Sequence, residues 1–131
     1  MIGLDTNILL RLWLNDDPAQ NKRIDKLLAE HGSTPGSLLV SDVVLAEALW
    51  TLRSAYRQDK AAQLLALRSL LGEPAFAFED GEAVALAVSL FEQHTCGFSD
   101  CLIAAKHARL GCSFTATFDR RMRKLTTVKV L

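Results

Sequence analysis

Short apolar runs alternate with longer amphipathic segments along this chain of 131 residues. Each run has the length of a strand, and the runs lie at residues 1–4, 37–40, 75–78, 113–117 and 126–131. The segments between them predict helices over residues 17–32, 41–56, 59–72, 80–94 and 99–111. Because parallel strands are joined through helical crossovers, the alternation predicts an α/β fold with a mainly parallel sheet of about five strands, flanked by helices.

The composition is that of a chain that folds around a core. Half of the residues are hydrophobic and 23% are charged, a balance typical of globular proteins. A chain of this length usually forms one unit, so a single domain is predicted over residues 1–131. Neither a membrane span of about 18 apolar residues nor a signal peptide is recognisable, so we expect a cytoplasmic protein. Three cysteines, an odd number, favour reduced thiols.

Three aspartates fall where such a sheet would carry a site. Asp5 follows the first apolar run, and Asp119 follows the run at 113–117. Because ligands bind outside the carboxyl ends of parallel strands, both carboxylates should project from the same rim of the sheet. Asp100 opens the helix predicted over 99–111 and belongs to the same edge if that helix runs back along the sheet.

Glu47 is a fourth acidic candidate, with no other charged residue for four positions on either side. At helical spacing it shares a face with Val43 and Trp50. An acid on an apolar face is costly unless it is paired, protonated or bound to a metal. An arginine partner in the core is the alternative, with Arg11 and Arg53 as candidates.

Each acid alone has a structural explanation. Asp5 or Asp100 could cap a helix, Asp119 could be a turn residue, and Glu47 could pair with an arginine. Capping, turn and pairing roles do not explain four acids on one rim, because carboxylates that lie close together repel one another. A cation relieves the repulsion, and ligands that are all oxygen favour Mg²⁺ or Mn²⁺.

The C-terminal part of the chain is basic although the net charge is zero. From Asp100 to Leu131, seven Lys or Arg stand against two Asp, a balance of +5, and the first 99 residues have eight against thirteen, a balance of −5. An isolated basic run is usually a solvated surface. Arg120 and Arg121 directly follow Asp119, however, and arginine binds phosphate bidentately, so both are candidate phosphate ligands.

Other kinds of site fit less well. His94, Cys96, Cys101 and His107 have a spacing unlike that of structural zinc sites, and buried thiols explain the cysteines better. A phospho-acceptor domain also gathers acids at strand ends, but it needs a lysine at the end of its last strand, whereas Lys129 lies inside the last run. Gly-rich phosphate loops and G-x-S-x-G elbows are absent.

Four blocks of sequence together resemble the PIN domain family, specifically the VapC-type toxin ribonucleases. They are "DTNILLR" near the start, the isolated Glu47, "FSDCLIAA" and "TATFDR". The resemblance implies a three-layer PIN-like fold and metal-binding acids at Asp5, Glu47, Asp100 and Asp119, with Asp5 and Asp100 contacting the metal most directly. It also implies a supporting polar role for Asn7 or Thr117.

The resemblance further implies the activity and partners of the protein. These are Mg²⁺-dependent hydrolysis of RNA by a metal-activated water, a VapB-type antitoxin that occupies the acidic groove, and a homodimer built near "LWTLRSAY". Many relatives have a further acid after the last motif, where this chain has Arg120, Arg121 and Arg123. The resemblance therefore leaves two alternatives, a site with one metal ion and a site with two. An RNA-binding module or a general PIN nuclease without an antitoxin is the alternative.

Overall fold

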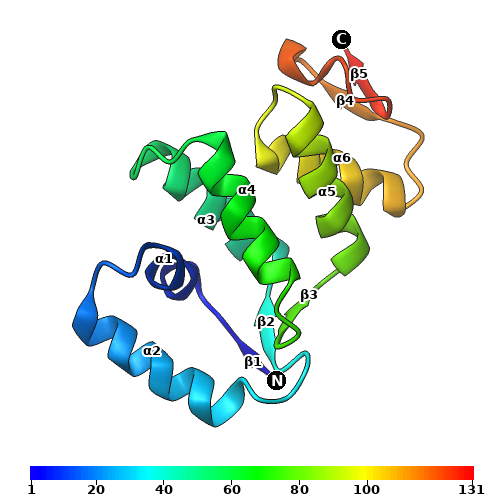
Figure 1. Cartoon of the computed structure of the whole chain (residues 1–131). Helices are drawn as coiled ribbons and strands as arrows, with labels where there is room; N and C mark the ends of the chain where they lie inside the picture. Colours follow the sequence, from blue (N-terminus) through cyan, green and yellow to red (C-terminus); the bar gives the residue numbers. More distant parts are fainter. The chain divides into compact units, whose positions relative to one another are not determined.

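The structure, a computed structural model, describes residues 1–131 and contains six α-helices and five short strands (Figure 1). The predicted α/β class is confirmed, and every strand pairing is parallel. The chain divides into two compact units, Met1–Glu79 and Asp80–Leu131, and each is described by itself. A single domain over the whole chain stays a prediction. None of the helices combines the length and the apolar character that a membrane span requires.

A parallel sheet of three strands lies in the first unit. Its strands stand in the order β1 (Ile2–Gly3), β2 (Leu38–Val40) and β3 (Phe76–Phe78). Ile2 lies opposite Leu38, and Leu38 lies opposite Phe76, so β2 is the central strand. Leu38 and Val40 are fully buried, as expected for the central strand of a covered parallel sheet.

Three predicted helices of the first unit are confirmed, and each begins at a side-chain cap. They are α2 (Pro18–His31), α3 (Asp42–Ser54) and α4 (Lys60–Leu71). Asp17, Ser41 and Asp59 accept hydrogen bonds from the otherwise unpaired N–H groups of the first turns. The apolar face of α3 faces the core through Leu45 and Leu49, which are fully buried.

The helix α1 (Thr6–Leu14) corrects the sequence-based expectation, which placed no helix before residue 17. Asp5 caps its start, and Asn15, in the left-handed conformation with φ of 49°, ends it. The helix buries Leu9 and Leu10 and packs against α2 and α3. The apolar run at residues 8–10 is too short for its periodicity to distinguish a helix from a strand, which is why α1 was missed.

The second unit contains two helices followed by a pair of strands. Its elements are α5 (Gly81–Gln93), α6 (Phe98–Arg109), β4 (Thr115–Thr117), the 3₁₀ helix η1 (Arg120–Met122) and β5 (Val128–Val130). Thr115 lies opposite Val128 in the parallel pair β4–β5. The ring of Phe91 on α5 meets the ring of Phe98 on α6 edge to face, with centroids 6.0 Å apart.

The start of α6 also differs from the expectation, which placed it at residue 99. Gly97 is the N-cap and provides no side-chain hydrogen bond, so the helix begins at Phe98. Burial of Phe98 against Phe91 accounts for the earlier start, because the aromatic ring is placed in the core by the first turn. The predicted end is confirmed: Gly111 follows α6 with φ of 89°, a conformation that favours glycine.

Candidate functional site

Asp5 stands two residues after the end of β1 and caps α1. Its backbone is extended, and its Oδ1 accepts a hydrogen bond from the Thr6 N–H at 2.7 Å. The side chain is exposed, and no hydrogen bond or ion pair engages Oδ2. Asp5 is therefore a helix cap that still has one carboxylate oxygen available for a cation.

Thr6 joins this end of α1 to Glu47 on α3. The Thr6 hydroxyl donates to Glu47 Oε2 at 3.2 Å, across 41 positions of sequence. Thr6 is 8% exposed, whereas Glu47 is exposed. Sequence reasoning considered Asn7 and missed Thr6, because the contact of Thr6 with Glu47 spans 41 positions and no sequence spacing indicates it.

The surroundings of Glu47 correct one step of the sequence argument. Val43 and Trp50, which share its face of α3, are 74% and 64% exposed, so this acid is not buried among apolar side chains. Helical periodicity grouped the three residues correctly but does not tell whether another element covers them. Arg11 is not the partner of Glu47, because its Nη1 pairs with Asp16 at 2.8 Å.

Asp100 and Asp119 lie in the second unit. Asp100 is in the first turn of α6 and is partly exposed. Asp119 follows β4 and caps η1, with its Oδ1 accepting from the Arg121 N–H at 2.9 Å. The Thr117 hydroxyl oxygen accepts from the Asp119 N–H at 3.0 Å and fixes the backbone there.

Arg121 forms a bidentate contact with the Asp119 carboxylate. Nε donates to Oδ1 at 3.1 Å, and Nη2 donates to Oδ2 at 2.9 Å. The side-chain hydrogen bonds from Arg121 are the main cause that lowers the pKa of Asp119, so this carboxylate stays ionised. The pKa of Arg121 is raised, first by Asp119 and further by the charge of Asp100. Arg121 is therefore a neighbour of both acids, whereas the Arg120 side chain is exposed and forms no ion pair.

The predicted acids thus fall into two pairs, each defined by a shared neighbour: Asp5 and Glu47 both accept from Thr6, and Asp100 and Asp119 both lie near Arg121. Within either unit, no three side chains of His, Cys, Asp or Glu gather as a metal-binding group. The donors available in each pair are carboxylate oxygens, which is the chemistry that suits Mg²⁺ or Mn²⁺. The convergence of both pairs on one rim stays a prediction.

The cysteines behave as thiols. Cys96 and Cys101 are buried, with Sγ atoms 3.5 Å apart, whereas Cys112 is exposed. His107 Nδ1 hydrogen-bonds with the Thr115 hydroxyl at 2.9 Å, which links α6 to β4. These contacts stabilise the packing inside the second unit.

Comparison with known proteins identifies the family of this chain. The model of the PIN domain family matches residues 2–127. A VapC ribonuclease from Aquifex aeolicus (strain VF5) is 25% identical over 122 residues, which cover 93% of this chain and 90% of that protein. Since the family model matches nearly the whole sequence, this chain belongs to the PIN domain family.

Proposed function

We propose that the protein is a Mg²⁺-dependent endoribonuclease and the toxin of a VapBC-type toxin–antitoxin pair. Membership of the PIN domain family and similarity to a VapC ribonuclease support this function. The observation that carries the proposal is the pair formed by Asp5 and Glu47. Two exposed carboxylates, Asp5 before the start of α1 and Glu47 on α3, both accept hydrogen bonds from Thr6, three residues beyond a parallel strand.

In this proposal the acids hold the cation and the arginines hold the RNA. A bound Mg²⁺ would act as a Lewis acid on an oxygen of the scissile phosphate and would lower the pKa of a water. Asp5 and Asp100 would hold the ion most directly, with Glu47 and Asp119 beside them. Thr6 fixes the direction of the Glu47 carboxylate, and Arg121 fixes that of the Asp119 carboxylate. Mn²⁺ is the alternative cation.

Hydrolysis then proceeds by attack of water on phosphorus. The bond between phosphorus and the 3′ oxygen breaks, which gives a 5′-phosphate on one product and a 3′-hydroxyl on the other. Glu47 or Asp119 accepts the proton of the attacking water, and the departing 3′ oxygen takes a proton from solvent. Arg120, whose guanidinium is not engaged in an ion pair, is the first candidate for contact with the RNA phosphates, and Arg121 is the second.

The test is cleavage of a labelled single-stranded RNA by the purified protein. We expect cleavage in Mg²⁺, none in EDTA, and recovery when Mg²⁺ is restored. The products should carry 5′-phosphates, detected by ligation to an adapter that requires this group. Cleavage that persists in EDTA, or products with cyclic phosphates, would contradict a water nucleophile activated by metal.

We also propose a homodimer formed through α3. Trp50 is exposed in the single chain, and Val43 extends the same apolar face. A second copy is the occupant we propose for this face. Similarity to a VapC ribonuclease supports a VapB-type antitoxin, placed over the acids, as the other partner. We place both in the cytoplasm.

The dimer should appear in size-exclusion chromatography with light scattering at micromolar concentration. Trp50→Glu should give a monomer, because a charge would be buried at the interface. Leu110→Glu, which alters an equally exposed apolar residue in the second unit, is the matched control and should remain dimeric. A wild-type monomer, or equal behaviour of the two variants, would count against this interface.

A further inference from the structure

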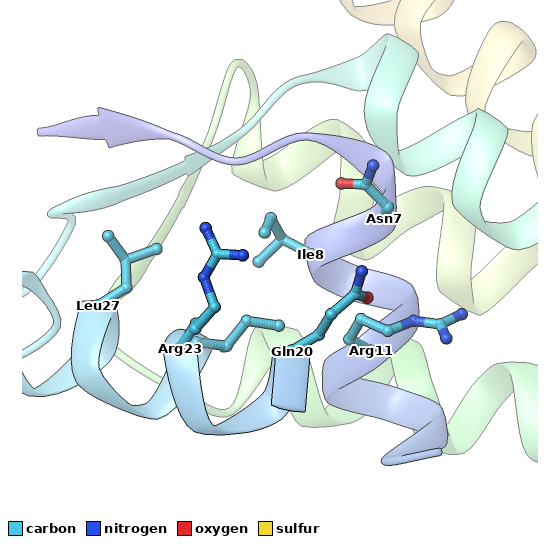
Figure 2. Close-up of a pocket in the computed structure, with 7 residues that line it drawn as sticks. Asn7, Ile8, Arg11, Gln20, Arg23 and Leu27 are labelled. Atoms are coloured by element: carbon cyan, nitrogen blue, oxygen red, sulfur yellow. The ribbon is translucent and has the colours of Figure 1, made fainter. Parts of the chain in front are cut away.

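A cavity of about 340 Å³ opens between α1 and α2 in the first unit (Figure 2). Its apolar wall is formed by Ile8, Ile24 and Leu27, and its polar rim includes Asn7, Gln20 and Arg23. The volume lies at the lower end of the range of roughly 300–1,000 Å³ that is usual for small-ligand sites. No acidic residue lines the cavity, so it suits a neutral or anionic ligand.

Arg23 is the cation in this cavity that remains available to a ligand. Its side chain is exposed and forms no ion pair, and Figure 2 shows it extending from α2 toward α1, beside Ile8. Arg11 also lines the cavity, but its guanidinium points away and is held by Asp16 at 2.8 Å and Tyr56 at 2.8 Å. A planar guanidinium next to an aliphatic wall forms a slot in which a nucleobase can stack.

The amide side chains of Asn7 and Gln20 offer hydrogen-bond donors and acceptors to the edge of a base. Asn7 and Gln20 each carry a carbonyl acceptor and an NH₂ donor. They enter the cavity from different helices, Asn7 from the start of α1 and Gln20 from the first turn of α2 (Figure 2). Hydrogen bonds to the edge of a stacked base are how proteins read single-stranded RNA.

The cavity also lies close to Asp5. Asn7 and Ile8 follow this acid by two and three positions on α1, and a helix rises about 1.5 Å per residue, so less than one turn separates them. One or two nucleotides of a single strand bridge such a distance. We propose that the cavity between α1 and α2 binds an unstacked base of the RNA substrate near the cleaved phosphate and contributes to the choice of cleavage position. The inference rests on the proposed ribonuclease function.

The test measures RNA binding without cleavage. Fluorescent single-stranded homopolymers of A, C, G and U are titrated with the full chain in EDTA and followed by anisotropy. Wild type should prefer one base, and Arg23→Ala should bind that RNA about tenfold more weakly because stacking is lost. Gln20→Ala should bind the four homopolymers with nearly equal affinity. Lys26→Ala removes a charge from the same helix outside the cavity, where Lys26 pairs with Glu30, and should keep the preference.

Arg23→Lys separates stacking from charge. Lysine keeps the positive charge but has no planar group, so this variant should lose the base preference while retaining much of the overall affinity. Free nucleoside monophosphates should displace the RNA only weakly. Tight displacement by one of them would assign the cavity to a soluble nucleotide and overturn the proposal.

The outcomes separate this inference from the nuclease proposal. If wild type binds one base preferentially but does not cleave RNA in Mg²⁺, the base site stands and the nuclease proposal fails. If wild type cleaves RNA while Arg23→Ala and Lys26→Ala bind and cut identically, the nuclease proposal stands and the base site is wrong.

Discussion

Asp5→Asn and Asp100→Asn should each reduce Mg²⁺-dependent RNA cleavage by more than about a hundredfold. Changes in the groups that merely orient metal ligands already cost roughly 10–100-fold, so loss of a direct ligand should exceed that range. Asparagine keeps the size of the side chain but removes the negative charge that holds a hard cation. The measurement is the initial rate of cleavage of labelled RNA at saturating Mg²⁺, for each variant beside wild type.

The choice of asparagine separates chemistry from folding. Asp5 caps α1, and asparagine is about as good an N-cap as aspartate, so Asp5→Asn should unfold at nearly the wild-type temperature. Asp25→Asn changes an exposed acid on α2 and serves as the control, with wild-type cleavage expected. Wild-type rates in both site variants would show that these acids do not hold the metal.

Phe98→Ala should lower the free energy of unfolding by about 3–5 kcal/mol, the usual cost of removing a buried aromatic ring. Phe98 is 2% exposed and its ring packs edge to face on Phe91. The loss is a large share of the roughly 5–15 kcal/mol that stabilises a typical domain. Because Phe98 begins the helix that carries Asp100, cleavage should also fall as the first turn of α6 loosens.

Phe118→Ala is the matched control for this substitution. It removes the same ring at a position that is 81% exposed, so the free energy of unfolding should change by no more than about 0.5 kcal/mol. Urea denaturation followed by circular dichroism measures both variants. Equal stability of the two would mean that the ring of Phe98 does not support the core of the second unit.

Much of the fold was predictable because its elements have local signals. Asp17 followed by Pro18 marks the start of α2, and Gly111 marks the end of α6. The helix α1 was not predictable from periodicity, since a run of three apolar residues fits a strand equally well. Asp5 was a candidate helix cap, but the sequence did not indicate that a helix begins directly after it, at Thr6.

The candidate site was predictable only in part, because its contacts are not local. Strand ends gave the positions of Asp5 and Asp119, and the pattern of α3 gave the isolation of Glu47. The hydrogen bond from Thr6 to Glu47 spans 41 positions, so no sequence spacing indicates it. The pairing of Arg121 with Asp119 was likewise missed, because charge composition does not show which anion an arginine contacts.

The exposed face of α3 links assembly to the chemistry of the site. Glu47 lies there between Val43 and Trp50, which are open to solvent in the single chain. Any partner that covers the two apolar side chains would also remove part of the solvent from around the carboxylate. A drier setting has a lower effective dielectric constant, in which the attraction between a carboxylate and a cation is stronger. Assembly and metal affinity would then reinforce each other, and the dissociation constant of the dimer would fall as the Mg²⁺ concentration rises.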